Sequence, residues 1–203
     1  DYIWPMGYDH NPFDDNNELV GRIENLALDF NDPSSIYRID SFYIQLGGTH
    51  GSLCDRNGND VKYVSNGCEI RNGQGQILSN GNRINSPGII WEDLCNEGFS
   101  NRYPWDNCAV MLPNPNQEDH TAMFHYFLFE ETRLDPFYTR ELRLTEMIGD
   151  TVVRKNSTVI ADTLFAGWLA SVKTADTMGW WVLTHEIFEN KIQIGRASCR
   201  ERV

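Results

Sequence analysis

The stretch TADTMGWWVLTHEIFENK, Thr174–Lys191, decides how the second half of this chain is expected to fold. Thr174 is of a type that commonly caps the start of a helix, and Asp176 would stand in the first turn. Residues at helical spacing then follow, namely Met178, Trp181, Val182, His185 and Phe188. This spacing predicts an amphipathic helix, in which Gly179 costs about 1 kcal/mol relative to Ala.

The three segments that precede this one show related patterns. They are HTAMFHYFLFEETRL, TRELRLTEMIG and NSTVIADTLFAGWLASV, at residues 120–134, 139–149 and 156–172. In the last of them, steps of three and four join Val159, Ile160, Leu164, Trp168, Leu169 and Val172. Such a stripe is typical of an amphipathic helix, so we expect the C-terminal half of the chain to be helical.

Residues 41–96 have a different pattern, in which short β-prone runs alternate with Gly and Asn clusters. The runs are SFYIQLGG, DVKYVS, CEIRNGQGQILSNGNRI and GIIWEDLC, so this half is expected to be mostly antiparallel sheet. Because strands come first and helices second, the sequence predicts an α+β fold. Residues 1–40 show no sustained period and are expected to form an irregular N-terminal arm, which leaves residues 41–193 as a single α+β domain.

The last ten residues, IGRASCRERV at Ile194–Val203, resemble the in-frame translation of a common short-read sequencing adapter. A match over the whole of this stretch is a specific signal, so the stretch is interpreted in the same way as a fusion scar. We therefore expect the native sequence to end near Gln193 and the domain to be truncated there. Cys199 would then lie outside the native protein.

Four cysteines remain, Cys54, Cys68, Cys95 and Cys108. Their separations of 14 and 13 residues favour two local disulfides, Cys54–Cys68 and Cys95–Cys108, among the three connectivities that four cysteines allow. The alternative is a metal site, but none of the pairs has the spacing of a zinc knuckle. Each loop of about 15 residues would stabilise the fold by roughly 3 kcal/mol in the chain-entropy model.

Asn156, Ser157 and Thr158 form an acceptor motif for N-glycosylation at Asn156. An even number of cysteines together with this motif is typical of a secreted protein, so the sequence predicts an extracellular glycoprotein. The first residue is Asp1 and no signal peptide is visible. We expect either that a signal has been removed or that the reading frame continues upstream.

The net charge of −12 restricts the partners that we expect. An acidic surface disfavours nucleic acid and anionic membranes, because both bind to basic surfaces. No stretch approaches the roughly 20 apolar residues of a membrane-spanning helix, so no membrane insertion is expected in this portion of the chain.

The segment THEIFEN, residues 184–190, carries the pattern of a metal site. In an HExxH helix two histidines one turn apart bind the same zinc ion, and the intervening Glu activates the metal-bound water. His185 and Glu186 occupy the first two positions, and Glu189 stands at the position of the second ligand. A carboxylate there would lie on the correct helix face, so the pattern predicts zinc bound by His185 and Glu189, with Glu186 as general base. The alternative is an ordinary amphipathic helix.

The order of a cysteine-bearing β-rich half, the phrase GIIWEDLCNEGF and the later WWVLTHEIFEN resembles the secreted fungal zincins related to deuterolysin. The matching positions are Cys95, Phe99, Leu183, His185 and Glu186. The resemblance implies a secreted zinc endopeptidase that acts on peptide or protein substrates. Glu189 stands where the family has its second His, and the family's third ligand, an Asp, would lie beyond Gln193. The rival prediction is a non-catalytic, secreted, disulfide-stapled binding or surface module.

Overall fold

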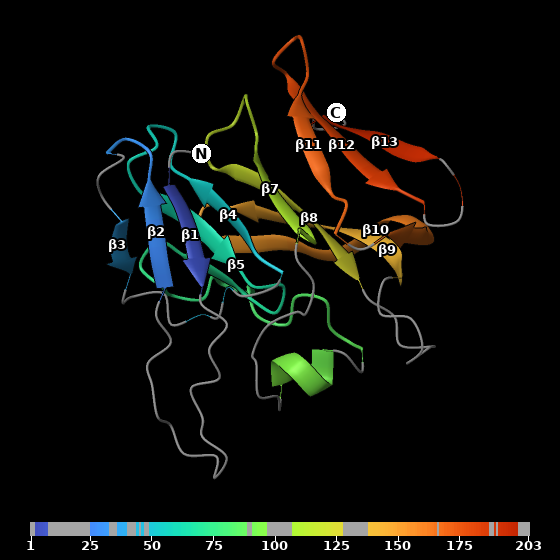
Figure 1. Cartoon of the computed structure of the whole chain (residues 1–203), viewed down its shortest axis with the longest axis horizontal. Coiled ribbons are helices and arrows are strands. Elements are labelled where there is room, and N and C mark those ends of the chain that lie inside the picture. The colour runs from blue at the N-terminus through green and yellow to red at the C-terminus, as the bar shows by residue number, and fades with distance from the viewer. Residues whose placement is uncertain are drawn as a thin grey trace.

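The computed structural model describes residues 3–7, 25–32, 36–39, 44, 46, 49–88, 91–96, 107–127, 138–165, 167–186, 189 and 191–198. Figure 1 shows that this part of the chain is built from antiparallel strands, with one short helical element, the π-helix η1 (Glu92–Asn96). The strands are β1 (Ile3–Gly7), β2 (Asn25–Asp29), β3 (Ile36–Ile39), β4 (Gly51–Cys54), β5 (Val61–Ser65), β6 (Ile70–Asn72), β7 (Ala109–Pro113), β8 (His120–Phe127), β9 (Tyr138–Ile148), β10 (Thr151–Phe165), β11 (Ala170–Lys173), β12 (Gly179–His185) and β13 (Ile192–Ser198).

The helical C-terminal half predicted from the sequence is wrong, and the α+β class is wrong with it. The four segments expected to be helices contain β8, β9, β10 with β11, and β12. These strands are rich in Thr, Val, Tyr and Trp, which fit a pleated and partly buried surface better than a helix. Strand pairing between distant segments therefore overrides the helix-like spacing of their apolar residues.

The strands form four sheets within the described ranges. We call them the N-terminal sheet (β1-β2-β3), the hairpin sheet (β4-β5-β6), the central sheet (β10-β9-β8-β7) and the C-terminal sheet (β11-β12-β13). All of the pairings within them are antiparallel. β13 runs into the adapter-like stretch, since it covers residues 194–198 as well as Ile192 and Gln193.

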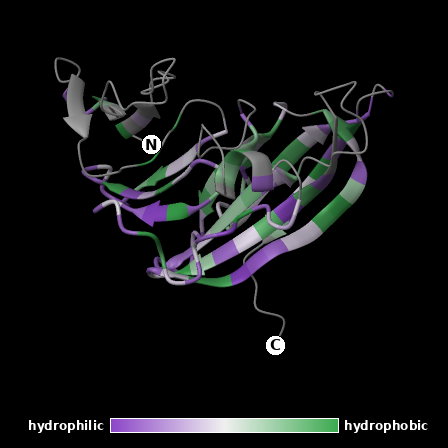
Figure 2. Cartoon of the chain, turned by 90° about the horizontal axis from the view of Figure 1, so that it is seen from below, coloured by the Kyte–Doolittle hydropathy of each residue, from purple (hydrophilic) through white to green (hydrophobic). Residues whose placement is uncertain are grey.

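The central sheet is covered on both faces, because alternate side chains of each strand point to opposite sides. One face buries Met111 and Met123 against Tyr63 of the hairpin sheet. The other face buries Tyr126 against Val182 of the C-terminal sheet. Figure 2 shows apolar residues recurring along the strands of these layers. Sheets packed in this way leave the edge strand β7 between the two flanking sheets.

Residues 1–40, where the sequence indicates an irregular arm, contain β1, β2 and β3. Ile3 and Ala27 are fully buried and pack with Val64 of β5. The N-terminal sheet therefore covers the side of the hairpin sheet that faces away from the central sheet. The remaining residues of the expected arm, among them 8–24, lie outside the described residues.

The β-rich first half is confirmed where the structure describes it. The run DVKYVS contains β5, and CEIRN contains β6. Of the run SFYIQLGG only Ile44 and Leu46 are described, and both are buried. The run GIIWEDLC ends in η1 instead of a strand.

The predicted disulfide pairing is wrong, because Cys68 is bonded to Cys95 across 27 residues. Each sulfur forms one disulfide, so neither Cys54–Cys68 nor Cys95–Cys108 is present. The bond ties the segment between β5 and β6 to η1. Cys54 is buried elsewhere, with Sγ 3.3 Å from the backbone nitrogen of Ile3.

No helix within the described part of the chain is long and apolar enough to cross a lipid bilayer.

Candidate functional site

The residues predicted to bind zinc lie at the end of a strand. His185 is the last residue of β12, and Glu186 follows it at an isolated bridge to Leu164. Successive residues of an extended chain point to opposite sides, so the one-turn helical spacing behind the zinc prediction does not apply here. The His185 ring lies 6.0 Å from the Trp168 ring, measured between centroids.

The two predicted carboxylates share a basic neighbour, Lys191. Glu186 is 8% exposed, accepts a hydrogen bond from Gln193 Nε2 and lies 3.8 Å from Lys191 Nζ. Glu189 forms an ion pair with Lys191, and its hydrogen bond and charge raise the pKa of that ammonium. Among the described residues, no group of three or more His, Cys, Asp and Glu is placed to hold a metal ion. Zinc binding by His185 and Glu189, and the general-base role of Glu186, stay predictions of the sequence. Phe99 lies outside the described residues.

Asn156, the predicted glycosylation acceptor, uses both ends of its side-chain amide in hydrogen bonds. Its Oδ1 accepts from the backbone N–H of Asn85 (3.0 Å), and its Nδ2 donates to the carbonyl oxygens of Arg83 (3.2 Å) and Ser86 (3.1 Å). Asn156 has a φ of 55°, in the left-handed region where Asn is enriched. The side chain therefore ties β10 to the loop that precedes η1. The glycan itself stays a prediction.

Replacing Asn156 with Asp is expected to lower the free energy of unfolding by about 1–3 kcal/mol, because the carbonyl oxygens of Arg83 and Ser86 lose their donors. Asp tolerates the same backbone conformation and keeps the acceptor oxygen, so the change removes the donor alone. Urea unfolding measures the loss. Thr158→Val is the matched control, since it also removes the acceptor motif but leaves the Asn156 amide in place. Equal losses in the two variants would contradict the role of the amide.

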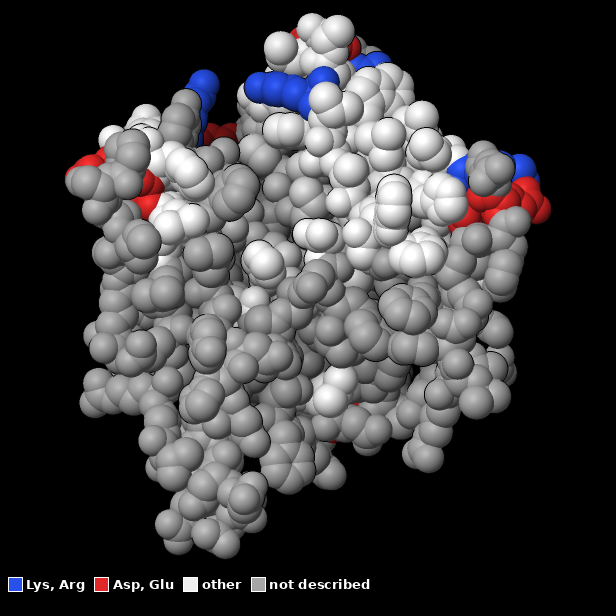
Figure 3. Space-filling view, in the orientation of Figure 1, with Lys and Arg blue, Asp and Glu red and all other residues white. Residues whose placement is uncertain are grey.

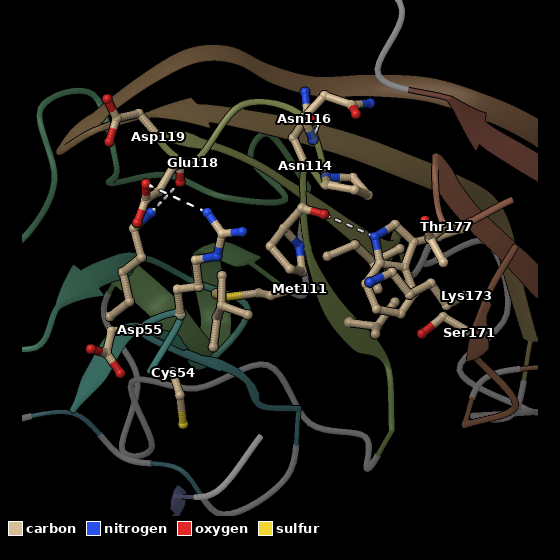
Figure 4. A pocket seen from close by; sticks show the side chains of 18 of the residues that line it. Cys54, Asp55, Met111, Asn114, Asn116, Glu118, Asp119, Ser171, Lys173 and Thr177 are labelled. Carbon is tan, nitrogen blue, oxygen red and sulfur yellow. Dashed lines mark hydrogen bonds and ion pairs between the residues drawn. The ribbon is translucent and has the colours of Figure 1, made fainter. Parts of the chain in front are cut away.

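A groove with a volume of about 1110 Å³ runs along β7, the edge strand of the central sheet. Its lining comes from three parts of the chain that are far apart in sequence, as Figure 4 shows. These are the β4–β5 hairpin, the β7 edge with the turn that follows it, and the β11–β12 hairpin. The groove exists because the hairpin sheet and the C-terminal sheet cover opposite faces of the central sheet and rise on either side of its edge.

The two walls of the groove differ in charge and in polarity. Asp55, Arg56 and Glu118 stand on the side of the β4–β5 hairpin, where Arg56 lies 3.9 Å from Glu118 in an exposed ion pair. Lys173 and Trp180 stand on the side of the C-terminal sheet, and Figure 4 shows Met111 between the two sides. In Figure 3 the described charged side chains of this face lie in separate clusters along the upper part of the molecule, with a hollow between two of them.

Trp180 joins the C-terminal sheet to the end of β7. Its Nε1–H donates a hydrogen bond to the carbonyl oxygen of Pro113 (2.8 Å). The ammonium of Lys173 lies 5.9 Å from the centroid of the Trp180 ring. The indole therefore holds one wall of the groove against its floor and carries a cation at the rim.

The β11–β12 turn at this rim is fixed by hydrogen bonds. The Thr174 hydroxyl donates to Asp176 Oδ1 (2.5 Å) and accepts from the backbone N–H of Gly179 (3.0 Å). The hydrogen bonds from Thr174 and from the backbone N–H of Met178 lower the pKa of Asp176 to about 2. Thr174 and Asp176, which the sequence pattern indicated as a helix start, thus form a hairpin turn that presents Met178 to the groove.

The sequence did not indicate the groove as a site. Its one local signal is the run LPNPNQED, residues 112–119, because Pro and Asn clusters mark turns that lie on the surface. In the structure this run is the end of β7 and the turn to β8, where Asn114 Oδ1 accepts from the backbone N–H of Asn116 (2.9 Å). The other lining residues show no pattern in common.

No family model matches this chain, and no match was found among curated proteins or among solved structures.

Proposed function

We propose that this chain is a secreted binding module that holds its ligand in the groove along β7. The observation that carries the proposal is the position of the groove, which has the edge of one sheet as its floor and two other sheets as its walls. Preformed concave sites between structural layers, with a few polar groups among apolar ones, are where proteins commonly bind ligands. Trp180 and Met111 supply apolar surface here, and Asp55 and Lys173 supply charge.

The extracellular location is part of the same proposal. The Cys68–Cys95 disulfide supports it, because such bonds persist in oxidising compartments and are rare in the cytosol. The net charge of −12 makes nucleic acid and anionic membranes poor candidates for the ligand, since both bind to basic surfaces.

Filling the groove is expected to abolish binding. Ser171 lines the groove from β11 and is partly exposed, so Ser171→Trp would occupy the space without disturbing the buried core. The purified chain and this variant are compared on arrays of peptides and of glycans. Ligands held in the groove should be lost from the variant, while its melting temperature stays close to that of the parent.

Val153→Trp is the matched control for this test. Val153 lies on β10, is 53% exposed and does not line the groove. This variant gains the same indole at a remote surface and should keep all binding. A ligand that binds Ser171→Trp as tightly as the parent chain would show that the groove is not the binding site.

A further inference from the structure

The register of β7 against β8 determines which backbone groups of β7 face the groove, and the inference below rests on the proposed function of that groove. The backbone N–H of Tyr126 donates to Cys108 O (2.9 Å), and that of Asn114 donates to His120 O (2.8 Å). In an antiparallel ladder, hydrogen-bonded pairs alternate with pairs whose N–H and C=O point outward. Counting inward from these two bonds, the N–H and C=O of Met111 point away from β8 and toward the open edge.

Both ends of this edge are closed by other groups. Toward its start, Gly51 of β4 packs on Ala109, since a Cβ added to Gly51 would lie 3.4 Å from Ala109 Cβ. Toward its end, Pro113 has no N–H, and its carbonyl oxygen is bonded to Trp180. Proline and covering groups are the usual means by which edge strands avoid unwanted pairing. The edge is therefore open over a short stretch centred on Met111.

The outward N–H and C=O of Met111 have no backbone partner among the described strands, since β7 pairs only with β8 in this part of the structure. Met111 is 4% exposed. Backbone polar groups at a buried position cost free energy unless they are hydrogen-bonded. A ligand with a main-chain donor and acceptor would satisfy both groups at once.

Lys173 adds a charge requirement on the wall of the groove. Its ammonium lies over the Trp180 ring, and the described residues include no carboxylate paired with it. On the opposite wall, by contrast, Lys62 Nζ donates to the carbonyl oxygen of Glu118 (2.9 Å) and Arg56 pairs with the Glu118 carboxylate. In a chain with a net charge of −12, an exposed cation without a carboxylate partner at a binding site favours an anionic group on the ligand.

We propose that the groove binds an extended peptide, which adds a short strand to β7 at Met111 and places a carboxylate against Lys173. Pairing of this kind takes its affinity from main-chain hydrogen bonds and its specificity from the side chains that alternate along the added strand. The carboxylate belongs either to an acidic side chain or to the C-terminus of the peptide, because both present the same group to the ammonium.

The backbone part of the proposal is tested with Met111→Pro against Met111→Ala. Both variants lose the same buried side chain, but only proline removes the outward N–H, and neither change removes a donor from the β7–β8 ladder. Peptides selected from a random library on the full chain are expected to bind Met111→Pro about tenfold more weakly than Met111→Ala. Equal affinities for the two variants would overturn the strand pairing.

The ligand side provides a measurement that does not depend on how Met111→Pro folds. Methylating single backbone nitrogens of a selected peptide should weaken binding at the position that faces Met111 and leave the neighbouring positions unaffected, because alternate N–H groups of a strand point to opposite sides. A scan in which no methylated position matters would contradict the proposal.

The charge part is tested with Lys173→Met, which keeps most of the aliphatic stem. Selected peptides should bind this variant about two- to fivefold more weakly, in line with an exposed ion pair. Amidating the C-terminus, and separately replacing Asp and Glu by Asn and Gln, shows which carboxylate is responsible. An effect of Lys173→Met that persists after both changes would overturn the charge contact.

The arrays also separate this inference from the proposed function. If the groove-filling variant Ser171→Trp loses glycans alone, the groove is a binding site and the peptide is wrong. If it loses no ligand at all, the proposed function fails.

Discussion

Removing the Cys68–Cys95 disulfide is expected to lower the free energy of unfolding by about 3–4 kcal/mol, because the bond closes a loop with a sequence separation of 27 residues. The double variant Cys68→Ala/Cys95→Ala should therefore melt roughly 10 °C lower than the parent chain. Urea unfolding with and without dithiothreitol measures the effect. The parent should lose this stability on reduction, whereas the double variant should not respond to the reductant.

The matched control is Cys54→Ala/Cys108→Ala, which removes two buried sulfur atoms and keeps the Cys68–Cys95 bond. This control should still lose stability on reduction. Peptide mapping of the non-reduced chain provides an independent readout, in which Cys68 and Cys95 are joined. A cross-linked peptide that contains Cys54 and Cys68 would contradict the structure and restore the pairing expected from the cysteine spacing.

The strands of the hairpin sheet could be predicted from the sequence because their signals are local. The run that contains β5 alternates, and the turn after β6 carries its own chemistry, since Asn72 Oδ1 accepts from the backbone N–H groups of Gln74 (3.1 Å) and Gln76 (3.0 Å). Turn residues and period-2 alternation are determined within a few residues. Such elements do not need a distant partner to be recognised.

The helices were predicted in error because two features of the central sheet imitate a helical pattern. β8 is buried on both faces, so its apolar residues form an almost continuous run without alternation. β10 pairs with β9 through several register shifts, and each shift changes which residues share a face. Val159 and Leu164 lie on the predicted helical stripe, yet Val159 is 49% exposed and Leu164 is fully buried. Steps of three and four thus arose from bulges.

The disulfide and the groove share one reason for being missed. Cys68 and Cys95 meet because η1 packs beside the β5–β6 segment, and the groove forms because three hairpins converge on the edge of β7. Neither encounter leaves a periodic or spaced signal along the chain. Sequence spacing favours the nearest partners, whereas antiparallel sheets that pack on one another bring together residues from distant segments.

His125 is a second point where the fold depends on a contact that the sequence does not indicate. It is fully buried on β8, with Nδ1 2.8 Å from Asn85 Oδ1 and Nε2 2.9 Å from Thr145 Oγ1. A neutral imidazole fits both partners, because Nδ1–H donates to the amide oxygen and Nε2 accepts from the hydroxyl. Burial, with a further contribution from the charge of Arg143, lowers the pKa of His125 to about 3.

This lowered pKa makes the stability of the fold depend on pH. In the unfolded chain the imidazole binds a proton near its ordinary pKa of about 6.5, whereas in the folded chain it stays neutral. The unfolded state then holds more protons, so the stability present above about pH 6.5 is lost as the pH falls toward the folded pKa. The expected slope is about 1.4 kcal/mol per pH unit, or about 2 kcal/mol lost at pH 5.

His125→Gln tests this assignment, because glutamine offers a donor and an acceptor to Asn85 and Thr145 but does not titrate. The variant is expected to be less stable than the parent at neutral pH and to lack the slope, as measured by urea unfolding at a series of pH values. His120→Gln is the matched control, since His120 lies on the same strand but is only half-buried, and it should keep the slope of the parent. If both variants lose stability with falling pH as steeply as the parent does, the acid sensitivity arises from other groups and His125 is not its source.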